Sequence, residues 1–250
     1  MLFGDLSTML KVCIVVDVEG FISLKQKNPM WNFLQRIKAK INYLLRNVKY
    51  DKNAFPKIYN LIVKYKFPIS FMLVGRLFKP ISKNHFIDYG YHTLNHKPLI
   101  YLSDKEIENE VKNIYNAASF SAPLWMIEEI SNPKRIFKAL KKEKYKITIY
   151  RGRVNGKVPV KGDKVLGIEK PFFRFGLKCV YPSFLLNNKE DEIKKILDDI
   201  MNNRKKGGVY CITTHDFIFK NLKNLEILIR ILKKMEKQRL IKIVNLRQLA

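Results

Sequence analysis

The sequence predicts an α/β protein with a single domain built on a largely parallel sheet. Short apolar runs rich in β-branched residues alternate with amphipathic stretches of helical period along the whole chain. The chain has 250 residues, of which 47% are hydrophobic and 12% aromatic, and this is enough for one large buried core. No internal repeat, low-complexity segment or linker rich in Pro, Gly or Ser divides it. We therefore expect a short lead-in over residues 1–10 and one domain over residues 11–250.

The first strand is predicted at Lys11–Val16, where a continuous apolar run is typical of a strand buried on both faces. Further strands are predicted at Ile69–Val74, Ala117–Phe120, Tyr145–Tyr150, Val209–Asp216 and Leu240–Val244, with shorter apolar runs at Phe86–Ile87, Val165–Ile168 and Leu177–Val180. Helices are predicted at Pro29–Val48, Ala54–Lys66, Ser103–Asn116, Asn132–Lys144, Asp191–Arg204 and Leu222–Gln238. The helix at Ser103 opens with the pattern of a capping box, in which Ser103 and Glu106 satisfy each other's backbone N–H groups.

The chain is strongly basic, with 48 Lys and Arg against 22 Asp and Glu and a formal net charge of +26. Such a charge favours anionic partners, among them nucleic acid, acidic lipid headgroups and phosphorylated or nucleotide-linked substrates. It is equally compatible with lysines that only solvate the surface, and the sequence contains no dedicated nucleic-acid-binding motif. The basic amphipathic helix at Pro29–Val48 suits either an anionic membrane surface or the exterior of an ordinary barrel.

Cysteine usage and hydropathy indicate the compartment. The cysteines, Cys13, Cys179 and Cys211, lie far apart, and an odd number without paired spacing predicts buried reduced thiols without a disulfide framework. No stretch approaches the ~20 apolar residues needed to span a bilayer, and the N-terminal residues lack the pattern of a secretory signal. We expect a soluble cytoplasmic protein that is at most peripheral to a membrane.

Polar residues that suit a metal site follow three of the predicted strands. Asp17 and Glu19 close the first strand, His92 and His96 follow the third, and His215 closes a late one. In an α/β barrel the carboxyl ends of the strands meet on one face, so residues far apart in sequence can converge there. One carboxylate and two imidazoles form a mixed oxygen and nitrogen site that suits zinc, with positions left for water and substrate. Asp17 then remains as a base and His215 as an acid.

Each of these features also has an ordinary structural interpretation. Two histidines four residues apart occur on protein surfaces and at helix caps, and acids after a strand occur in solvated turns. The order of the motifs along the chain is more specific than any one of them.

That order resembles the polysaccharide deacetylases, the NodB-like carbohydrate esterases. The similar blocks are Val16–Gly20 for the family's first motif, Pro68–Gly75 for its second strand, Tyr89–Leu99 for its histidine motif, Ser121–Leu124 for its third motif and Ile212–Asp216 for its final histidine motif. The resemblance covers Val12–Leu249, nearly the whole chain. It implies a distorted (β/α)7 barrel of the NodB-homology type over residues 11–250.

The sequence departs from the family pattern at three places. Ser121 stands where the third motif usually begins with Arg, and no Asp is found near the end of the strand at Ile147–Tyr150, where the fourth motif normally supplies one. Glu19 is one methylene longer than the usual metal-binding Asp. From charge alone, Arg151, Arg153 and Arg174 are candidates to replace the missing Arg.

The resemblance also implies roles for individual residues. It assigns a divalent metal, with zinc expected, to Glu19, His92 and His96, the general base to Asp17 and the general acid to His215. The substrate and oxyanion residues would be Pro123, Leu124 and Trp125, with the Leu124 backbone N–H as the donor to the oxyanion. Trp125 or Tyr150 would stack on a sugar ring or, alternatively, pack in the core.

The implied activity is a metal-dependent hydrolase that removes an N-acetyl or other N-acyl group from an amino sugar. We expect the substrate to be a cytosolic nucleotide-linked or lipid-linked N-acetylated saccharide, because the basic surface favours phosphates. Two alternatives remain open: a catalytically degenerate barrel that binds nucleic acid or an anionic membrane surface, and a related metal-dependent amidase or deformylase.

Overall fold

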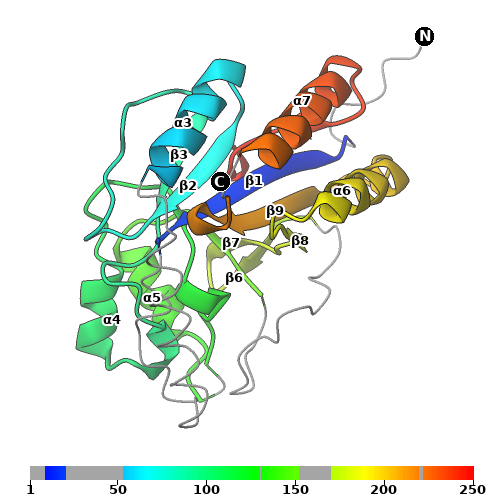
Figure 1. Ribbon diagram of the computed structural model, residues 1–250. Helices are drawn as coiled ribbons and strands as arrows, with labels where there is room; N and C mark the ends of the chain where they lie inside the picture. The colour runs from blue at the N-terminus through cyan, green and yellow to red at the C-terminus, as the bar shows by residue number, and fades with distance from the viewer. Residues whose placement is uncertain (1–8, 21–52, 130, 152–169, 220–221) are drawn as a thin grey trace, which may run out of the picture.

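The computed structural model describes residues 9–20, 53–129, 131–151, 170–219 and 222–250 (Figure 1). Its strands are β1 Lys11–Val18, β2 Ile69–Leu73, β3 Ile87–Tyr91, β4 Ser119–Phe120, β5 Ile147–Ile149, β6 Phe172–Arg174, β7 Leu177–Val180, β8 Phe184–Leu185, β9 Val209–His215 and β10 Lys242–Ile243. Its helices are α3 Ala54–Tyr65, α4 Asp104–Glu110, α5 Arg135–Lys142, α6 Glu190–Asn203 and α7 Lys223–Lys237. Short 3-10 helices are η2 Leu99–Tyr101, η3 Pro123–Trp125, η4 Asp216–Ile218 and η5 Leu246–Leu249. The predicted helix at Pro29–Val48 and the run at Val165–Ile168 lie outside the described residues.

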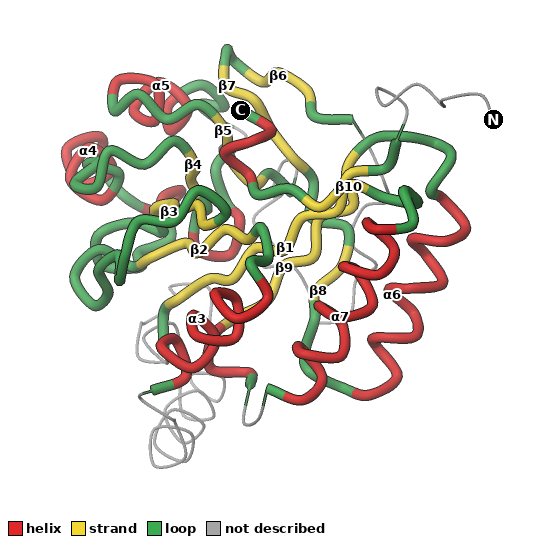
Figure 2. Tube along the Cα trace, turned by 90° about the horizontal axis from the view of Figure 1, so that it is seen from above, coloured by secondary structure: helices red, strands yellow, loops and turns green. Residues whose placement is uncertain are grey.

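The strands form one curled sheet with the order β6-β7-β5-β4-β3-β2-β1-β9-β8, and β10 pairs with the start of β1. Every pairing is parallel except that of β6 with β7. Figure 2 shows β1 in the middle of the sheet, between β2 and β9. The curled sheet with helices on its outer side is the half-barrel expected for a distorted α/β barrel, so the predicted fold class is confirmed.

Three apolar clusters hold these layers together. One lies between the sheet and α3, α6 and α7, and a second lies beneath α4 and α5. The third fills the inside of the curled sheet, where Cys13, Val15 and Cys211 contact residues of β5, β7 and η5. Val12 to Val18 of β1 are all buried, because this strand has helices on one side and the inner cluster on the other. Each buried Val, Leu or Ile side chain contributes roughly 1.5–3 kcal/mol relative to its exposed state.

Strands β6 and β8 were not predicted from the sequence, and the other differences are mainly at the ends of the predicted elements. β1 continues two residues past Val16, since its pairing with β9 extends to Asp17 and its pairing with β2 extends to Val18. The capping box at Ser103 is confirmed, but the helix ends at Glu110 and the prediction that it reaches Asn116 is wrong. Asn113 explains the ending, because its side chain accepts from the Ala117 N–H at 2.8 Å and donates to the Ala117 carbonyl at 2.9 Å, closing a turn.

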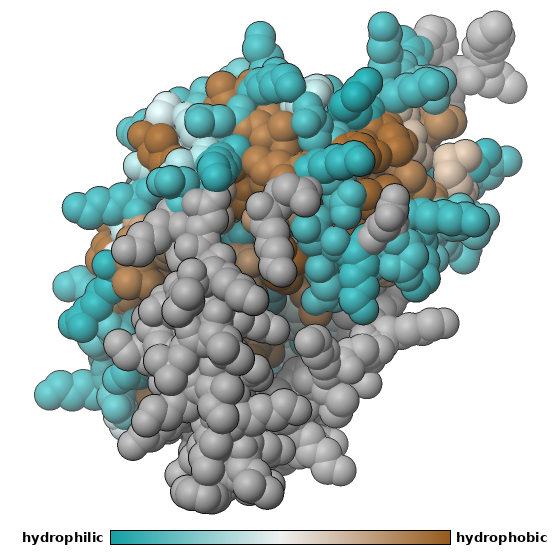
Figure 3. Space-filling view, in the orientation of Figure 1, coloured by the Kyte–Doolittle hydropathy of each residue, from teal (hydrophilic) through white to brown (hydrophobic). Residues whose placement is uncertain are grey.

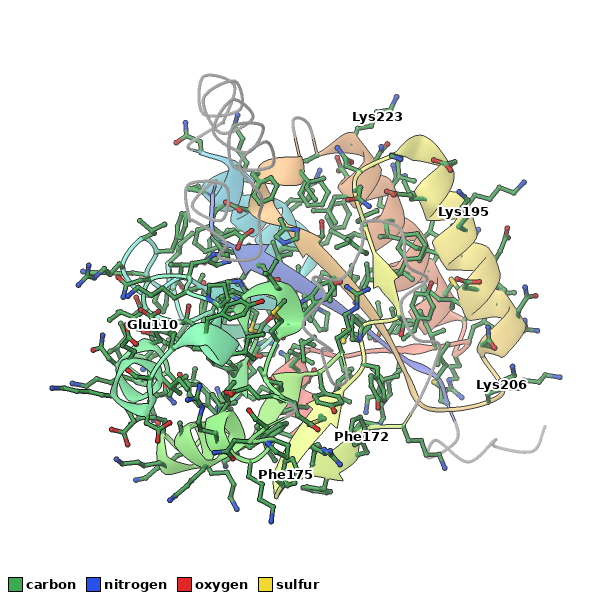
Figure 4. The ribbon with its side chains drawn as sticks, turned by 90° about the horizontal axis from the view of Figure 1, so that it is seen from below. Glu110, Phe172, Phe175, Lys195, Lys206 and Lys223 are labelled. Atoms are coloured by element: carbon green, nitrogen blue, oxygen red, sulfur yellow. The ribbon has the colours of Figure 1, made fainter. Side chains whose placement is uncertain are left out.

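The three cysteines are free and buried, as predicted. Among the described residues, none of the helices combines the length and the apolar character needed to cross a bilayer. Hydrophilic side chains cover much of the described surface on the face shown in Figure 3, with smaller hydrophobic areas between them. Figure 4 shows Lys195, Lys206 and Lys223 extending outward from the region of α6 and α7. These three lysines therefore carry part of the positive charge at the surface.

Candidate metal centre and active site

Neighbouring strands bring the predicted site residues to one edge of the sheet. The β1–β9 register places Asp17 beside His215, and the β1–β2 register places Asp17 beside Met72. β3 runs parallel to β2, and the loop that follows it begins at His92. The carboxyl ends of β1, β3 and β9 thus lie close together, as the parallel topology predicts.

Glu19, His92 and His96 form a buried cluster at this edge, with side chains 3%, 2% and 4% exposed. One ligand atom from each of the three residues lies within 4.8 Å of the others. The Glu19 Oε2 atom is 3.4 Å from His92 Nε2 and in direct contact with His96 Nε2. The cluster could hold a metal ion, since a carboxylate oxygen and two imidazole nitrogens are a donor set that borderline-soft divalent ions accept.

The two histidines are oriented in different ways. His92 Nδ1 lies 2.8 Å from the carbonyl oxygen of Ser121, which can only accept, so Nδ1 carries the proton and Nε2 faces Glu19. This is the arrangement usually found for a metal-ligating histidine, whose second nitrogen donates to a carbonyl or carboxylate. His96 Nδ1 is also buried but has no hydrogen-bond partner within the described part of the chain.

Asp17 lies behind the cluster, with its Oδ1 atom 3.7 Å from His92 Nδ1. Burial raises the pKa of the Asp17 carboxyl, and the nearby charges of His92 and His215 only partly offset that effect. Burial also acts to raise the pKa of Glu19, but His96 and His215 outweigh it and hold that pKa well below its usual range. The two carboxyls therefore differ: Glu19 is the more strongly ionised, and Asp17 is the more basic.

His215, the last residue of β9, is the fifth predicted residue at this edge of the sheet. Its Nε2 atom is 3.5 Å from Glu19 Oε1, and its side chain is 23% exposed, whereas the other site residues are buried. A partly exposed imidazole beside a buried carboxylate is a group that can meet a substrate and exchange a proton with it. The structure thus brings together all five predicted residues, Asp17, Glu19, His92, His96 and His215.

Asp216 was not predicted to have a role, but it fixes the loop that carries Glu19. It is fully buried, and its Oδ1 atom accepts from the Glu19 N–H at 3.2 Å and from the Gly20 N–H at 3.1 Å. Gly20 has a φ of 57°, a left-handed conformation that glycine adopts without the steric cost of a Cβ. The only sequence signal is that an Asp directly follows His215, and this does not indicate which backbone groups it meets.

The residues predicted to contact substrate lie in and beside η3. Leu124 is 37% exposed and has a φ of 59°, in the left-handed region that leucine rarely adopts. Trp125 is 7% exposed and packs with the inner cluster, and the Arg151 guanidinium lies 5.7 Å from its ring centre. Tyr150 is also buried, and its hydroxyl donates to Glu128 at 2.8 Å. Pro123, which begins η3, is buried. Core packing therefore accounts for both aromatic rings.

The proposed replacement of the missing Arg by Arg174 is wrong. Arg174 binds the buried Glu128 with two hydrogen bonds, of 2.9 Å from Nε and 2.6 Å from Nη2, and so its guanidinium is committed to Glu128. Arg151 lies over the Trp125 ring, and Arg153 lies outside the described residues. The Ser121 hydroxyl, which stands where the family has Arg, is buried without a hydrogen-bond partner in the described structure.

No protein-family model matches the sequence, and no curated protein matches it either. Among solved structures, the fold is similar to that of a protein from Mycobacterium smegmatis assigned as a polysaccharide deacetylase, with 11% identity and a TM-score of 0.64 over 99% of this chain and 91% of that chain. It is also similar to a 4-alpha-glucanotransferase from Thermococcus litoralis, with 8% identity and a TM-score of 0.54 over 96% of this chain and 38% of that chain. A family 4 carbohydrate esterase from Streptomyces lividans, solved in complex with acetate, has 8% identity and a TM-score of 0.47 over 91% of this chain and 88% of that chain.

Identities this low show a common fold and nothing finer. Within that limit, the resemblance found in the sequence motifs is confirmed at the level of the fold, because the neighbour with a TM-score of 0.64 is assigned as a polysaccharide deacetylase and the sheet has the curled form of a distorted α/β barrel. The chain has the polysaccharide deacetylase fold, with a buried cluster of Glu19, His92 and His96 at the carboxyl ends of its strands.

Proposed function

We propose that this protein is a metal-dependent hydrolase that removes an N-acetyl or other N-acyl group from an amino sugar. The observation that carries the proposal is the convergence of Asp17, Glu19, His92, His96 and His215 at one edge of the sheet. The fold alone does not choose the reaction, because it also resembles part of a glucanotransferase. Two imidazoles, two carboxylates and a partly exposed third imidazole can together supply the metal ligands, the general base and the general acid of a metal-assisted amide hydrolysis.

In this proposal Glu19, His92 and His96 hold a divalent ion, and zinc suits their donor set. When bound, such an ion supplies Lewis-acid polarisation of the acyl carbonyl and of the attacking water. Asp17 accepts the proton of that water at a carboxylate oxygen, and burial makes this carboxylate more basic than an exposed one. His215 donates a proton to the leaving amine, and the Leu124 N–H stabilises the oxyanion. The products are the free amino sugar and a carboxylate such as acetate.

The substrate we propose is a nucleotide-linked or lipid-linked N-acetyl saccharide in the cytoplasm. The formal net charge of +26 supports this choice, because a phosphate next to the sugar would be attracted to a basic surface. The protein would then work in solution or at the surface of an anionic membrane.

Metal content and acetate release test the proposal together. Purified protein should contain about one equivalent of divalent metal and should release acetate from an N-acetylhexosamine donor. Asp17→Asn should keep the metal but lose about 100–10,000-fold in rate, the usual contribution of a general base. Asp198→Asn is a matched control, because Asp198 is an exposed aspartate on α6, and it should keep the parent rate.

The outcomes separate the proposal from its alternatives. Metal without acetate release from any N-acetylated sugar would favour another acyl group, as in an amidase or deformylase. Protein that binds no metal and releases no acetate would favour a non-catalytic barrel. Substrates with and without a phosphate group, compared at low and high salt, test the substrate class, because attraction to a basic surface weakens as salt rises.

A further inference from the structure

We infer that Glu110, at the end of α4, is a positioning residue that orients His96 for metal binding. The inference rests on the proposed metal site and adds to it a residue that no sequence motif indicates. Glu110 is 1% exposed, and Figure 4 labels it in the crowded part of the molecule around α4. Within the described structure no Lys, Arg or His nitrogen lies within 4.0 Å of its carboxylate. Burying a carboxylate without a cationic partner costs free energy unless hydrogen bonds satisfy its oxygens. The groups that donate to Glu110 therefore show what this side chain supports.

Both carboxylate oxygens of Glu110 accept from Asn95, the residue before His96. Oε2 accepts from the Asn95 backbone N–H at 2.7 Å, and Oε1 accepts from the Asn95 side-chain amide at 2.6 Å. The backbone carbonyl of Glu110 accepts from the Leu94 N–H at 2.8 Å. A single residue of α4 therefore fixes two consecutive peptide units of the loop that joins His92 to His96.

This loop needs such support because its backbone is strained. Thr93 and His96 both have a φ of 60°, in the left-handed region that costs non-glycine residues about 1–3 kcal/mol each. On its other side the loop is held by the turn after β2, where the Gly75 N–H donates to the Thr93 carbonyl and the Arg76 N–H donates to the Leu94 carbonyl, each at 3.0 Å. Glu110 supplies the opposing contacts, so that the conformation is fixed from both sides.

His96 depends on this support more than His92 does. The His92 ring is oriented by its own hydrogen bond to the Ser121 carbonyl, whereas His96 Nδ1 has no such bond to any described residue. With no partner at Nδ1, the direction of the His96 ring is set by the backbone at His96 and by its contact with Glu19. Glu110 acts on that backbone one residue away, through Asn95.

Cobalt binding tests the inference, because Co²⁺ in a histidine and carboxylate site has a visible spectrum that reports ligand geometry. Glu110→Ala should lower the affinity for Co²⁺ about 10–100-fold, the usual effect of removing a group that orients a metal ligand, and should change the spectrum. Glu110→Gln should recover part of the affinity, since its carbonyl can still accept from the Asn95 N–H. Circular dichroism of the metal-free protein would establish that each variant is folded.

Two control variants lie on the same helix. Glu108→Ala removes an exposed carboxylate whose ion pair with Lys142 spans 2.8 Å, and it should leave the affinity unchanged. Ile107→Ala removes a buried side chain from α4 and should lower the thermal stability but keep the affinity and spectrum. Glu110→Ala with the parent affinity and spectrum would overturn the inference, and so would an equal loss in Ile107→Ala. A parent protein that binds no Co²⁺ would instead overturn the metal site itself, and the role of Glu110 with it.

Discussion

A metal bound at the proposed site should stabilise the protein by an amount that depends on its concentration relative to the Kd, and its removal should reverse that stabilisation. Glu19, His92 and His96 come from two separate segments and are all buried, so the complete ligand set exists only in the folded chain. A ligand that binds only the folded state at 100 times its Kd contributes about 2.7 kcal/mol. In a chain of 250 residues, each kcal/mol added to the free energy of unfolding raises the Tm by about 2–4 °C. We therefore expect zinc at that excess to raise the Tm by about 5–11 °C, and a chelator to reverse the rise.

The assay is thermal unfolding with zinc, with chelator and with zinc added back. His96→Ala removes a ligand and should abolish the zinc-dependent shift. His85→Ala is the matched control, because His85 is exposed and lies outside the cluster, and it should keep the full shift. A parent protein whose Tm is the same in zinc and in chelator would refute the metal site, as would a full shift in His96→Ala.

Three further predictions follow from buried contacts. Asp216→Ala removes the acceptor of the Glu19 and Gly20 N–H groups. At about 1.5 kcal/mol for each hydrogen bond to a charged group, the free energy of unfolding measured in urea should fall by about 3 kcal/mol. Asp216→Asn keeps an acceptor oxygen and should lower the free energy of unfolding by less. Burial raises the pKa of Asp88 above 3.8, so the folded state binds its proton more tightly and stability should fall as pH rises from 3.8 through the raised value. Asp88→Asn should lose this part of the pH dependence, which urea unfolding at several pH values would measure. Gly90→Ala would place a Cβ 2.3 Å from the sulfur of Met72, and calorimetry should show a loss of about 1–3 kcal/mol from overpacking.

The parts of the site that sequence could predict are those fixed by strand ends. A buried parallel strand has a recognisable apolar pattern, and its first polar residue marks the carboxyl edge of the sheet. Asp17 and His215 were found in this way, and the register that pairs β1 with β9 places them side by side. The fold class followed from the same pattern, because strands and helices alternate along the chain.

The supporting contacts could not be predicted, because they depend on loop conformation. In the sequence Glu110 is indistinguishable from the other acidic residues of a charged helix. Its hydrogen bond with Asn95 depends on the end of α4 at Glu110, which the sequence did not predict. Its burial could not be inferred from periodicity, since a helix of seven residues ends before a pattern is established. The proposed role of Arg174 failed for a similar reason: charge alone cannot show that Glu128 is the nearer partner.

The charge balance of the site favours a metal centre over a degenerate barrel. Asp17 and Glu19 are both buried, and the buried carboxylate of Asp216 lies beside Glu19. The basic side chains near Asp17 and Glu19 in the described structure are histidines, and no Lys or Arg nitrogen lies within 4.0 Å of either carboxylate. Three buried carboxylates with only imidazoles to balance their charge are costly, and a non-catalytic barrel would gain stability by replacing such groups with apolar residues. A divalent cation at Glu19, His92 and His96 would offset this cost, and it would also favour the ionised form of Asp17, whose Oδ1 atom accepts no hydrogen bond from the described residues. Ser121, which cannot carry a positive charge, supports the same argument, because a bound ion would then be the main source of fixed positive charge near Asp17.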